Sequence, residues 1–307
     1  MCCLFGFVDY GHQLSRKQRS RLLSVLSTAC EERGTDATGI AYNAAGKQVI
    51  FKRPLPAHLM WYRVPVNATI VMGHTRMTTQ GSEKRNENNH PFSGSIGKAQ
   101  FALAHNGVLY NDKSLRRELK LPDTKIETDS YVAVQLLEKY GKLDFDGLRF
   151  MSEELEGSFT ISALSDRDEL FIAKGNNPIV IHHFPDSQLY VYASTEEILQ
   201  KALMKTGLPL GRTERVSVHT GELLRIDARG RVNRSLFDDS KLYTTFMPPW
   251  TRWSSYEPVK RPYADTTNYL DDLKAVAVYF GIYPEDVDAL LEDGMTPDEI
   301  EEFLYCG

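Results

Sequence analysis

The fold is decided by the stretch GSFTISALSDRDELFIAKGNNPIVIHH at residues 157–183. It contains three short apolar runs, and Asp, Gly, Asn or Pro, the residues that favour turns, separate each run from the next. Apolar runs of this length between turn residues predict β-strands. The pattern continues to about residue 235, so we expect five strands, at residues 158–164, 170–173, 179–183, 189–193 and 222–226.

The chain before this block carries further strands and most of the helices. Apolar runs predict strands, at residues 4–8, 38–42, 48–52, 69–73 and 100–104. Helical spacing predicts helices, at residues 15–33 with Ser15 as N-cap, 113–120, 130–140 and 145–154. Strands and helices in separate blocks favour antiparallel sheets covered by helices over alternating βαβ units. The polar segment 77–96 is too long for a simple connector, so we expect a functional loop.

The composition is that of an ordinary globular protein. Hydrophobic residues make up 42% and charged residues 25% of the chain, which supports a packed core. No apolar run approaches the ~20 residues that cross a bilayer, so we expect no membrane partner. The net charge of -5 gives no basis for nucleic acid binding. The four cysteines have neither zinc-ligand spacing nor a disulfide framework, so we expect a soluble cytoplasmic protein without metal or cofactor.

The end of the sequence differs from the rest in charge. Residues 265–307 carry 12 acidic residues and one basic residue, Lys274. We predict three segments: a main domain at residues 2–240, a linker with prolines and tryptophans at 241–264, and a small acidic helical module at 265–307. The apolar spacing of this module fits packing onto itself or the main domain, and its charge fits docking to a basic partner. Both interpretations stay open.

Cys2 follows Met1 directly, and a small second residue permits removal of the methionine. An N-terminal cysteine would carry a thiol and a free α-amine, whose ordinary pKa of ~7.7–8.0 leaves much of it available as a base. A base held beside a nucleophile activates it. Taken alone, Cys2 is equally compatible with a chance cysteine or, together with Cys3, with a lipidation site.

Four motifs together indicate a family. They are, in chain order, MCCLFG with ERGTDATG at residues 1–6 and 32–39, GHTRMTTQG at 73–81, HNG with YN at 105–111, and ETDS at 127–130. Over about residues 2–235 the chain resembles class II glutamine amidotransferases, of the N-terminal-nucleophile hydrolase superfamily. The resemblance implies an α+β fold, a four-layer αββα sandwich of two antiparallel sheets. It also implies hydrolysis of the side-chain amide of L-glutamine, through a cysteine thioester, to glutamate and ammonia.

By this resemblance three residues would be catalytic. Cys2, exposed at the N-terminus by loss of Met1, would be the nucleophile, and its own amine would be the base. The side-chain amide of Asn106 and the backbone N–H of Gly107 would form the oxyanion hole, a role that suits fixed, uncharged donors. The competing interpretation of Asn106 and Gly107 is a simple turn.

Four further residues would bind the substrate by the same resemblance. Arg76 would hold the α-carboxylate of glutamine through two parallel hydrogen bonds, a geometry that Lys could not reproduce. Thr79 would add a hydroxyl, and Asp129 would accept from the α-ammonium. His90 matches a family position near the substrate. The simpler interpretations are an ion pair of Arg76 with a surface acid and a helix cap at Asp129.

The sequence departs from the family near the expected site. Cys3 stands where the family usually has Gly, and its side chain could crowd the site, compete in oxidation or have no effect. Met77 and Gln80 stand where members that use sugar phosphates often have an aromatic residue and a histidine, so the loop is expected to close differently. His74 and His105, at the ends of expected strands, fit a structural role better than a catalytic one.

Most family members fuse this domain to a synthase that consumes the ammonia. The sequence shows no Gly-rich phosphate-binding loop, and we expect no synthase after residue 240. We therefore expect the ammonia acceptor to lie on a separate protein or to be absent. Two alternatives stay open, an amidase of the same superfamily acting on another γ-glutamyl or amide compound, and a non-catalytic glutamine-binding regulatory module. Arg76 with Asp129 disfavours simple acyl amides, and Cys2 together with Asn106 and Gly107 disfavours an idle module.

Overall fold

The computed structural model describes residues 2–242, 270, 273, 274, 277, 282–296 and 300. Two β-sheets form the centre of the described part, and the strands within each sheet pair antiparallel. The first sheet has seven strands in the order β11-β9-β10-β1-β4-β2-β3. The second has six strands in the order β13-β12-β8-β7-β6-β5.

The strands of the first sheet are β1 (Cys3–Asp9), β2 (Ala37–Ala44), β3 (Lys47–Arg53), β4 (Ile70–Arg76), β9 (Val180–Phe184), β10 (Leu189–Ala193) and β11 (Glu214–Val216). Those of the second sheet are β5 (Phe92–Ile96), β6 (Ala99–Leu109), β7 (Gly157–Ser165), β8 (Glu169–Lys174), β12 (Glu222–Asp227) and β13 (Val232–Leu236). The helices are α1 (Arg16–Ala29), α2 (Asp112–Glu118), α3 (Tyr131–Tyr140), α4 (Phe145–Glu154), α5 (Glu196–Thr206) and α7 (Pro284–Glu292).

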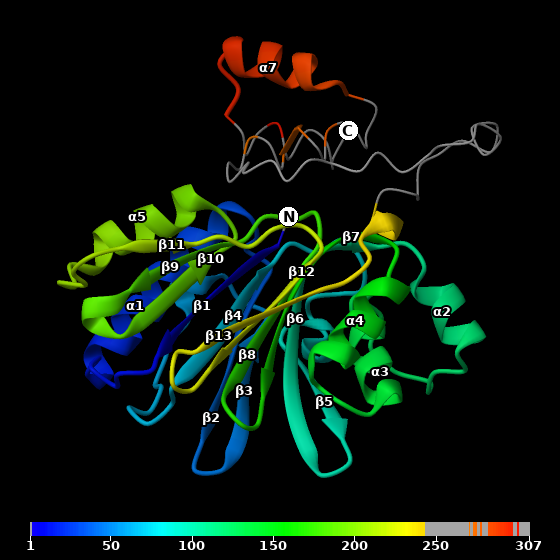
Figure 1. The fold of residues 1–307 in the computed structure, drawn as a ribbon, viewed down its shortest axis with the longest axis horizontal. Helices are drawn as coiled ribbons and strands as arrows, with labels where there is room; N and C mark the ends of the chain where they lie inside the picture. The colour runs from blue at the N-terminus through cyan, green and yellow to red at the C-terminus, as the bar shows by residue number, and fades with distance from the viewer. Residues whose placement is uncertain are drawn as a thin grey trace.

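The two sheets are stacked between two layers of helices. Figure 1 shows α1 and α5 on the outer face of the first sheet, and α2, α3 and α4 on the outer face of the second. Each of the three interfaces has its own apolar core. One core joins α1 and α5 to the first sheet, one joins the two sheets, and one joins the second sheet to α3 and α4. The expected four-layer αββα sandwich is confirmed.

Strand β1 lies in the middle of the first sheet and is buried on both faces. Phe5 and Phe7 pack toward α1 and α5, whereas Leu4 and Val8 pack toward the second sheet. A strand covered on both faces has a continuous apolar sequence, which explains the apolar run at residues 4–8. Because β1 runs antiparallel to β4, the beginning of β1 lies beside the end of β4.

The start of α1 lies where the sequence predicts it. The Ser15 side chain accepts from the backbone N–H of Gln18, and the Gln18 side chain accepts from the backbone N–H of Ser15. This reciprocal pair is a capping box, and it confirms Ser15 as the N-cap. The helix ends at Ala29, earlier than the expected residue 33, because a 3₁₀ turn at Cys30–Glu32 follows it.

Two strands extend further than the sequence pattern indicates. Strand β4 continues to Arg76 and β6 continues to Leu109, so His74 and His105 lie inside strands rather than at their ends. The interpretation of residues 106–107 as a simple turn is therefore wrong. The register with β7 keeps this part of β6 extended until Leu109 lies opposite Gly157. The expected loop at residues 77–96 also ends early, because residues 92–96 form β5 beside β6.

The C-terminal residues in the described part have a small core of their own. Val287 of α7 is buried, and it belongs to one cluster with Leu273, Ala277 and Ile300. Beyond Leu242, which is buried against the helices of the second sheet, the predicted linker lies outside the described residues. The division into three segments therefore stays a prediction. In the described part of the chain, no helix has the length and apolar character that crossing a bilayer requires.

Candidate active site

The candidate site is centred where β1 begins and β4 ends. The antiparallel register places Cys2, the residue before β1, beside Arg76, the last residue of β4. The thiol sulfur of Cys2 lies 3.6 Å from the carbonyl oxygen of Met77. Arg33 Nε donates to the carbonyl oxygen of Cys2 at 3.1 Å. The backbone of Cys2 is thus held in place by the loop before β2.

The environment of Cys2 disfavours its thiolate. Cys2 is half-buried, and this burial raises the pKa of its thiol. The positive charge of Arg76 lowers that pKa, and the negative charge of Asp129 raises it. Both side chains are therefore within electrostatic reach of the sulfur, one from β4 and the other from the start of α3. Because the thiol is mostly protonated at neutral pH, attack by the sulfur requires a base.

Asn106 and Gly107 lie in β6, opposite β7. The Asn106 side chain is fully buried, and neither its Oδ1 nor its Nδ2 has a hydrogen-bond partner among the described residues. An unpaired buried polar group costs ~1–3 kcal/mol, so this arrangement suits a ligand that supplies the partner. Gly107 has a φ of +140°, and a Cβ there would lie 2.0 Å from the carbonyl oxygen of Ser158. Only glycine fits this position.

Arg76 is buried, and its guanidinium contacts only uncharged groups in the part of the chain that the structure describes. It donates to Asn89 Oδ1 at 2.7 Å, and to the carbonyl oxygens of Gln80 at 2.6 Å and Gly81 at 3.0 Å. No described carboxylate forms an ion pair with it, so the surface ion pair considered above is not formed. Burial lowers the pKa of Arg76, while nearby acidic groups oppose this effect. A buried cation that forms no ion pair favours an anionic ligand.

Asp129 connects α3 to the end of β6. Its Oδ2 accepts from the backbone N–H of Leu109 at 2.6 Å, and its Oδ1 accepts from Ser130 Oγ at 3.2 Å. Helix α3 has no side-chain cap, so the interpretation of Asp129 as a helix cap is wrong. Within the described residues Asp129 forms no ion pair. Its carboxylate is therefore available to a cation close to the oxyanion candidates of β6.

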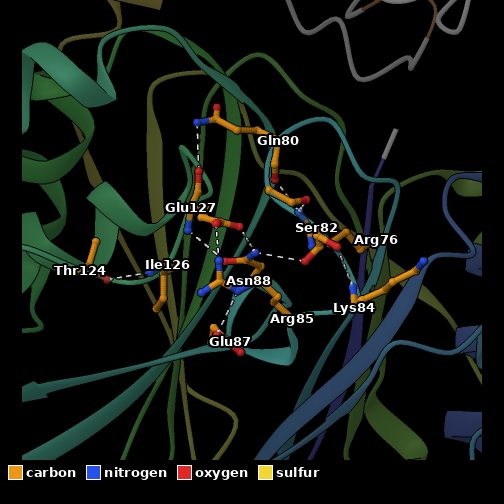
Figure 2. A network of polar contacts seen from close by, with 11 residues as sticks. Arg76, Gln80, Ser82, Lys84, Arg85, Glu87, Asn88, Thr124, Ile126 and Glu127 are labelled. Atoms are coloured by element: carbon orange, nitrogen blue, oxygen red, sulfur yellow. Dashed lines mark hydrogen bonds and ion pairs between the residues drawn. The ribbon is translucent and has the colours of Figure 1, made fainter.

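The loop after β4 is anchored to Glu127, as Figure 2 shows. The Glu127 carboxylate forms an ion pair with Arg85 and accepts from Asn88 Nδ2 at 2.8 Å. Its backbone N–H donates to Asn88 Oδ1 at 2.9 Å, and Gln80 Nε2 donates to its carbonyl oxygen at 3.0 Å. Because Glu127 precedes Asp129 by two residues, this network joins the loop that follows Arg76 to the position expected to bind the ammonium.

Thr79 and His90 have different surroundings. Thr79 is exposed in the loop and makes no hydrogen bond to a described residue. His90 is buried, its ring centroid lies 4.1 Å from that of His74, and neither of its nitrogens has a described partner. Burial holds the pKa of His90 well below its ordinary value, and the nearby positive charge of Arg76 contributes. His90 is therefore neutral at physiological pH.

His74 and His105 connect the two sheets. Nε2 of His74 lies 3.0 Å from the carbonyl oxygen of His105, and Nδ1 of His105 lies 2.8 Å from Ser130 Oγ. Burial lowers the pKa of His74 to about 3, so its ring is neutral. These contacts agree with the expected structural role. Among the described residues, no group of three or more His, Cys, Asp or Glu is arranged to hold a metal ion.

The Cys3 side chain points away from the candidate site. It is fully buried in the core between the first sheet and the helices α1 and α5, and its Sγ lies 2.8 Å from Cys30 Sγ. Both thiols are free. Successive side chains of an extended chain point to opposite faces, so the side chain of Cys3 does not crowd the thiol of Cys2.

Asn177 carries no signal in the sequence that would mark it as part of the site. It is fully buried in the turn after β8, and its Nδ2 donates to the carbonyl oxygen of Asn106 at 2.9 Å. The two residues are 71 positions apart, and no periodic pattern connects them. The Asn-Asn-Pro sequence at residues 176–178 signals only that one strand ends before another begins. The contact could be found only from the tertiary structure.

Comparisons with known proteins agree on one family. A family model described as "Glutamine amidotransferase domain" matches residues 61–216. The glutamine–fructose-6-phosphate aminotransferase (isomerizing) of Geobacillus kaustophilus is 34% identical over 190 residues, which cover 59% of this chain and 30% of the relative. The Bacillus subtilis protein of the same name is 34% identical over 187 residues, which cover 57% of this chain and 30% of the relative. The chain thus spans about 30% of the length of these curated relatives.

Solved structures show the same fold. Glutamine phosphoribosylpyrophosphate amidotransferase from B. subtilis, complexed with ADP and GMP, superposes with a TM-score of 0.60. The superposition covers 77% of this chain and 49% of that chain at 22% identity. A second structure, described as the allosteric regulatory enzyme of purine biosynthesis, gives a TM-score of 0.61 at 20% identity and covers 79% of this chain and 50% of that chain. At these identities the likeness concerns the fold alone.

Proposed function

The chain belongs to the glutamine amidotransferase domain family, and from that premise we propose that it hydrolyses the side-chain amide of L-glutamine with Cys2 as the nucleophile. Loss of Met1 frees the α-amine of Cys2, which takes the proton of the thiol. The sulfur attacks the amide carbon, and the amine returns the proton to the leaving nitrogen. Ammonia departs, and a glutamyl thioester remains on Cys2. Water then cleaves the thioester to glutamate and the free thiol.

The observation that carries this proposal is the unpaired amide of Asn106. Attack on the glutamine amide places a negative charge on the amide oxygen, and this charge needs donors that are already in position. We assign this role to Nδ2 of Asn106 and the backbone N–H of Gly107. The Asn106 amide is buried and has no partner among the described residues, so a bound oxyanion would supply the missing acceptor.

The charges around Cys2 support glutamine as the substrate. Free glutamine carries an α-carboxylate and an α-ammonium, and each needs a partner when it leaves water. Arg76 and Asp129 are buried, opposite in charge, and without an ion-pair partner in the described residues. We propose that Arg76 holds the carboxylate and Asp129 the ammonium. Thr79 would add a hydrogen-bonding hydroxyl from the loop after β4, and the buried ring of His90 would form part of the surface near the substrate.

We further propose that the ammonia is used by an acceptor on a separate protein. The curated relatives are aminotransferases, and the match covers about 30% of their length. The residues proposed for the site account for the release of ammonia from glutamine, and not for its transfer to an acceptor. The free thiols of Cys2, Cys3 and Cys30 fit a reducing, cytoplasmic compartment.

The test combines intact mass with an assay of glutamate release. The wild type, Cys2→Ala and Cys3→Ala are compared, because Cys3 is an adjacent thiol that faces the other way. We expect loss of Met1, turnover by the wild type and by Cys3→Ala, and none by Cys2→Ala. A processed wild type that releases no glutamate would refute the stand-alone glutaminase. Release from γ-glutamyl anilides but not from glutamine would favour the amidase alternative.

A further inference from the structure

Asn177 is held rigidly against the strands that carry the proposed oxyanion hole. Its side chain is fully buried. Its backbone N–H donates to the carbonyl oxygen of Phe159 at 3.4 Å, and its own carbonyl oxygen accepts from Thr160 Oγ1. Both partners belong to β7, which pairs with β6 at residues 106 and 107. The turn after β8 is thus fixed to the strand next to the proposed site.

The Asn177 side-chain nitrogen makes two hydrogen bonds to this part of the structure. Nδ2 donates to the carbonyl oxygen of Asn106 at 2.9 Å and to Ser158 Oγ at 3.3 Å. It also fills the space beneath Gly107, because a Cβ on that glycine would lie 2.5 Å from Nδ2. Asn177 therefore bonds to the carbonyl of Asn106 and occupies the space that a side chain at residue 107 would need.

This peptide bond links the carbonyl of Asn106 to the N–H of Gly107. The unit is planar and trans, so its C=O and its N–H point in opposite directions. A donor that fixes the direction of the carbonyl therefore fixes the direction of the N–H as well. A hydrogen bond to the carbonyl oxygen also polarises the unit and makes the N–H a better donor.

We infer that Asn177 is a positioning residue for the glutaminase reaction, which aims the backbone N–H of Gly107 at the oxyanion through its hydrogen bond to the carbonyl of Asn106. This inference rests on the proposed function. It extends the site to a residue of the turn after β8, outside the motifs that predicted the other positions. Its effect should appear where negative charge develops on oxygen, and nowhere else.

The test uses Asn177→Ala and the nearly isosteric Asn177→Asp, with Asn176→Ala as the matched control. Asn176 is the adjacent buried asparagine, and its Oδ1 accepts from the backbone N–H of Phe159 at 3.0 Å without contacting residue 106. We expect kcat to fall about 10- to 100-fold in the Asn177 variants, less than the ~10²–10³-fold loss on removing an oxyanion donor itself. KM for glutamine should stay within about twofold, and the control should keep its kcat within about threefold.

Two reagents separate positioning from a general structural role. Alkylation of Cys2 by iodoacetamide develops no oxyanion, so its rate should be the same in the Asn177 variants and in the wild type. Glutamate γ-semialdehyde forms a hemithioacetal with Cys2, and its affinity should fall by the same factor as kcat. Alkylation slowed in parallel with kcat would overturn the inference, and so would a kcat equal to that of the wild type. If Asn177→Ala does not fold, Asn177→Asp decides.

Failure of the proposed function has a different signature. In that case the wild type itself would release no glutamate and would bind no semialdehyde at Cys2. An active wild type with an unaffected Asn177→Asp variant would overturn only the role of Asn177.

Discussion

Replacing Asn106 by Ala should separate activity from stability. A buried asparagine usually stabilises the fold through its hydrogen bonds, and removing one bonded partner costs ~1–3 kcal/mol. The Asn106 side chain has no such partner among the described residues. Its removal relieves an unpaired polar group, which offsets the small cavity left behind. We therefore expect the free energy of unfolding to rise or to stay within about 1 kcal/mol of the wild type.

The same change should be severe for catalysis. Loss of one oxyanion donor lowers kcat by ~10²–10³, which corresponds to ~2.7–4 kcal/mol of transition-state stabilisation. KM for glutamine should change little, because the donor acts on charge that develops only during the reaction. Glutamate release gives kcat and KM, and urea unfolding of the same samples gives the free energy of unfolding.

A second buried asparagine provides the comparison. Nδ2 of Asn43 in β2 donates to the carbonyl oxygen of Ser165 at 2.8 Å and to Asp168 Oδ1 at 3.0 Å. Asn43→Ala should therefore lose ~1–3 kcal/mol of stability and keep its kcat. The reasoning fails if Asn106→Ala behaves like Asn43→Ala, with a clear loss of stability and unchanged turnover.

Three further predictions concern the surroundings of the site. Arg76→Lys should raise KM for glutamine at least ~10-fold, because Lys lacks the planar guanidinium that binds a carboxylate through two hydrogen bonds. The increase in KM should vanish for γ-aminobutyramide, which has no α-carboxylate. Glu127→Gln removes the carboxylate that pairs with Arg85. This contact is worth up to ~1 kcal/mol, because both side chains are half-exposed. Initial rates should therefore show KM for glutamine raised about fivefold and kcat retained. The depressed pKa of His74, about 3, contributes stability above pH 6.5 that is lost as pH falls. Burial also lowers the pKa of His90 and of His105, so both proteins lose further stability over the same range. In urea titrations between pH 7.5 and 5.0 the wild type should therefore lose ~2 kcal/mol more than His74→Gln.

Features specified by neighbouring residues could be predicted from the sequence. The helix expected at residues 145–154 matches α4, and Ser15 caps α1 as expected. Apolar spacing and a capping side chain act over one or two helical turns, so the signal lies within the segment itself. The four-layer arrangement with two sheets was expected from the family resemblance, and antiparallel sheets covered by helices were also expected from the blocks of strands and helices.

Features that depend on distant partners could not be predicted. Asn106 and Gly107 look like a turn in isolation, but pairing with β7 keeps them in a strand. The motifs predicted the positions of Cys2, Arg76 and Asp129, whereas only the structure places the charges of Arg76 and Asp129 close enough to shift the pKa of the thiol. The role of Glu127 as an anchor and the contact of Asn177 with residue 106 join segments that share no local pattern.

The polar groups left unpaired in the described residues explain why this site is suited to a ligand and not only to folding. Both polar atoms of Asn106, both ring nitrogens of His90 and Nδ1 of His74 are buried without a partner, and all three residues lie in or beside β4, β5 and β6. Arg76 adds a buried charge that forms no ion pair with a described carboxylate. Each of these groups destabilises the fold, so the large apolar cores on both sides of the sheets must offset them. A zwitterion whose amide becomes an oxyanion would satisfy Asn106, Arg76 and the nearby carboxylate of Asp129 at once.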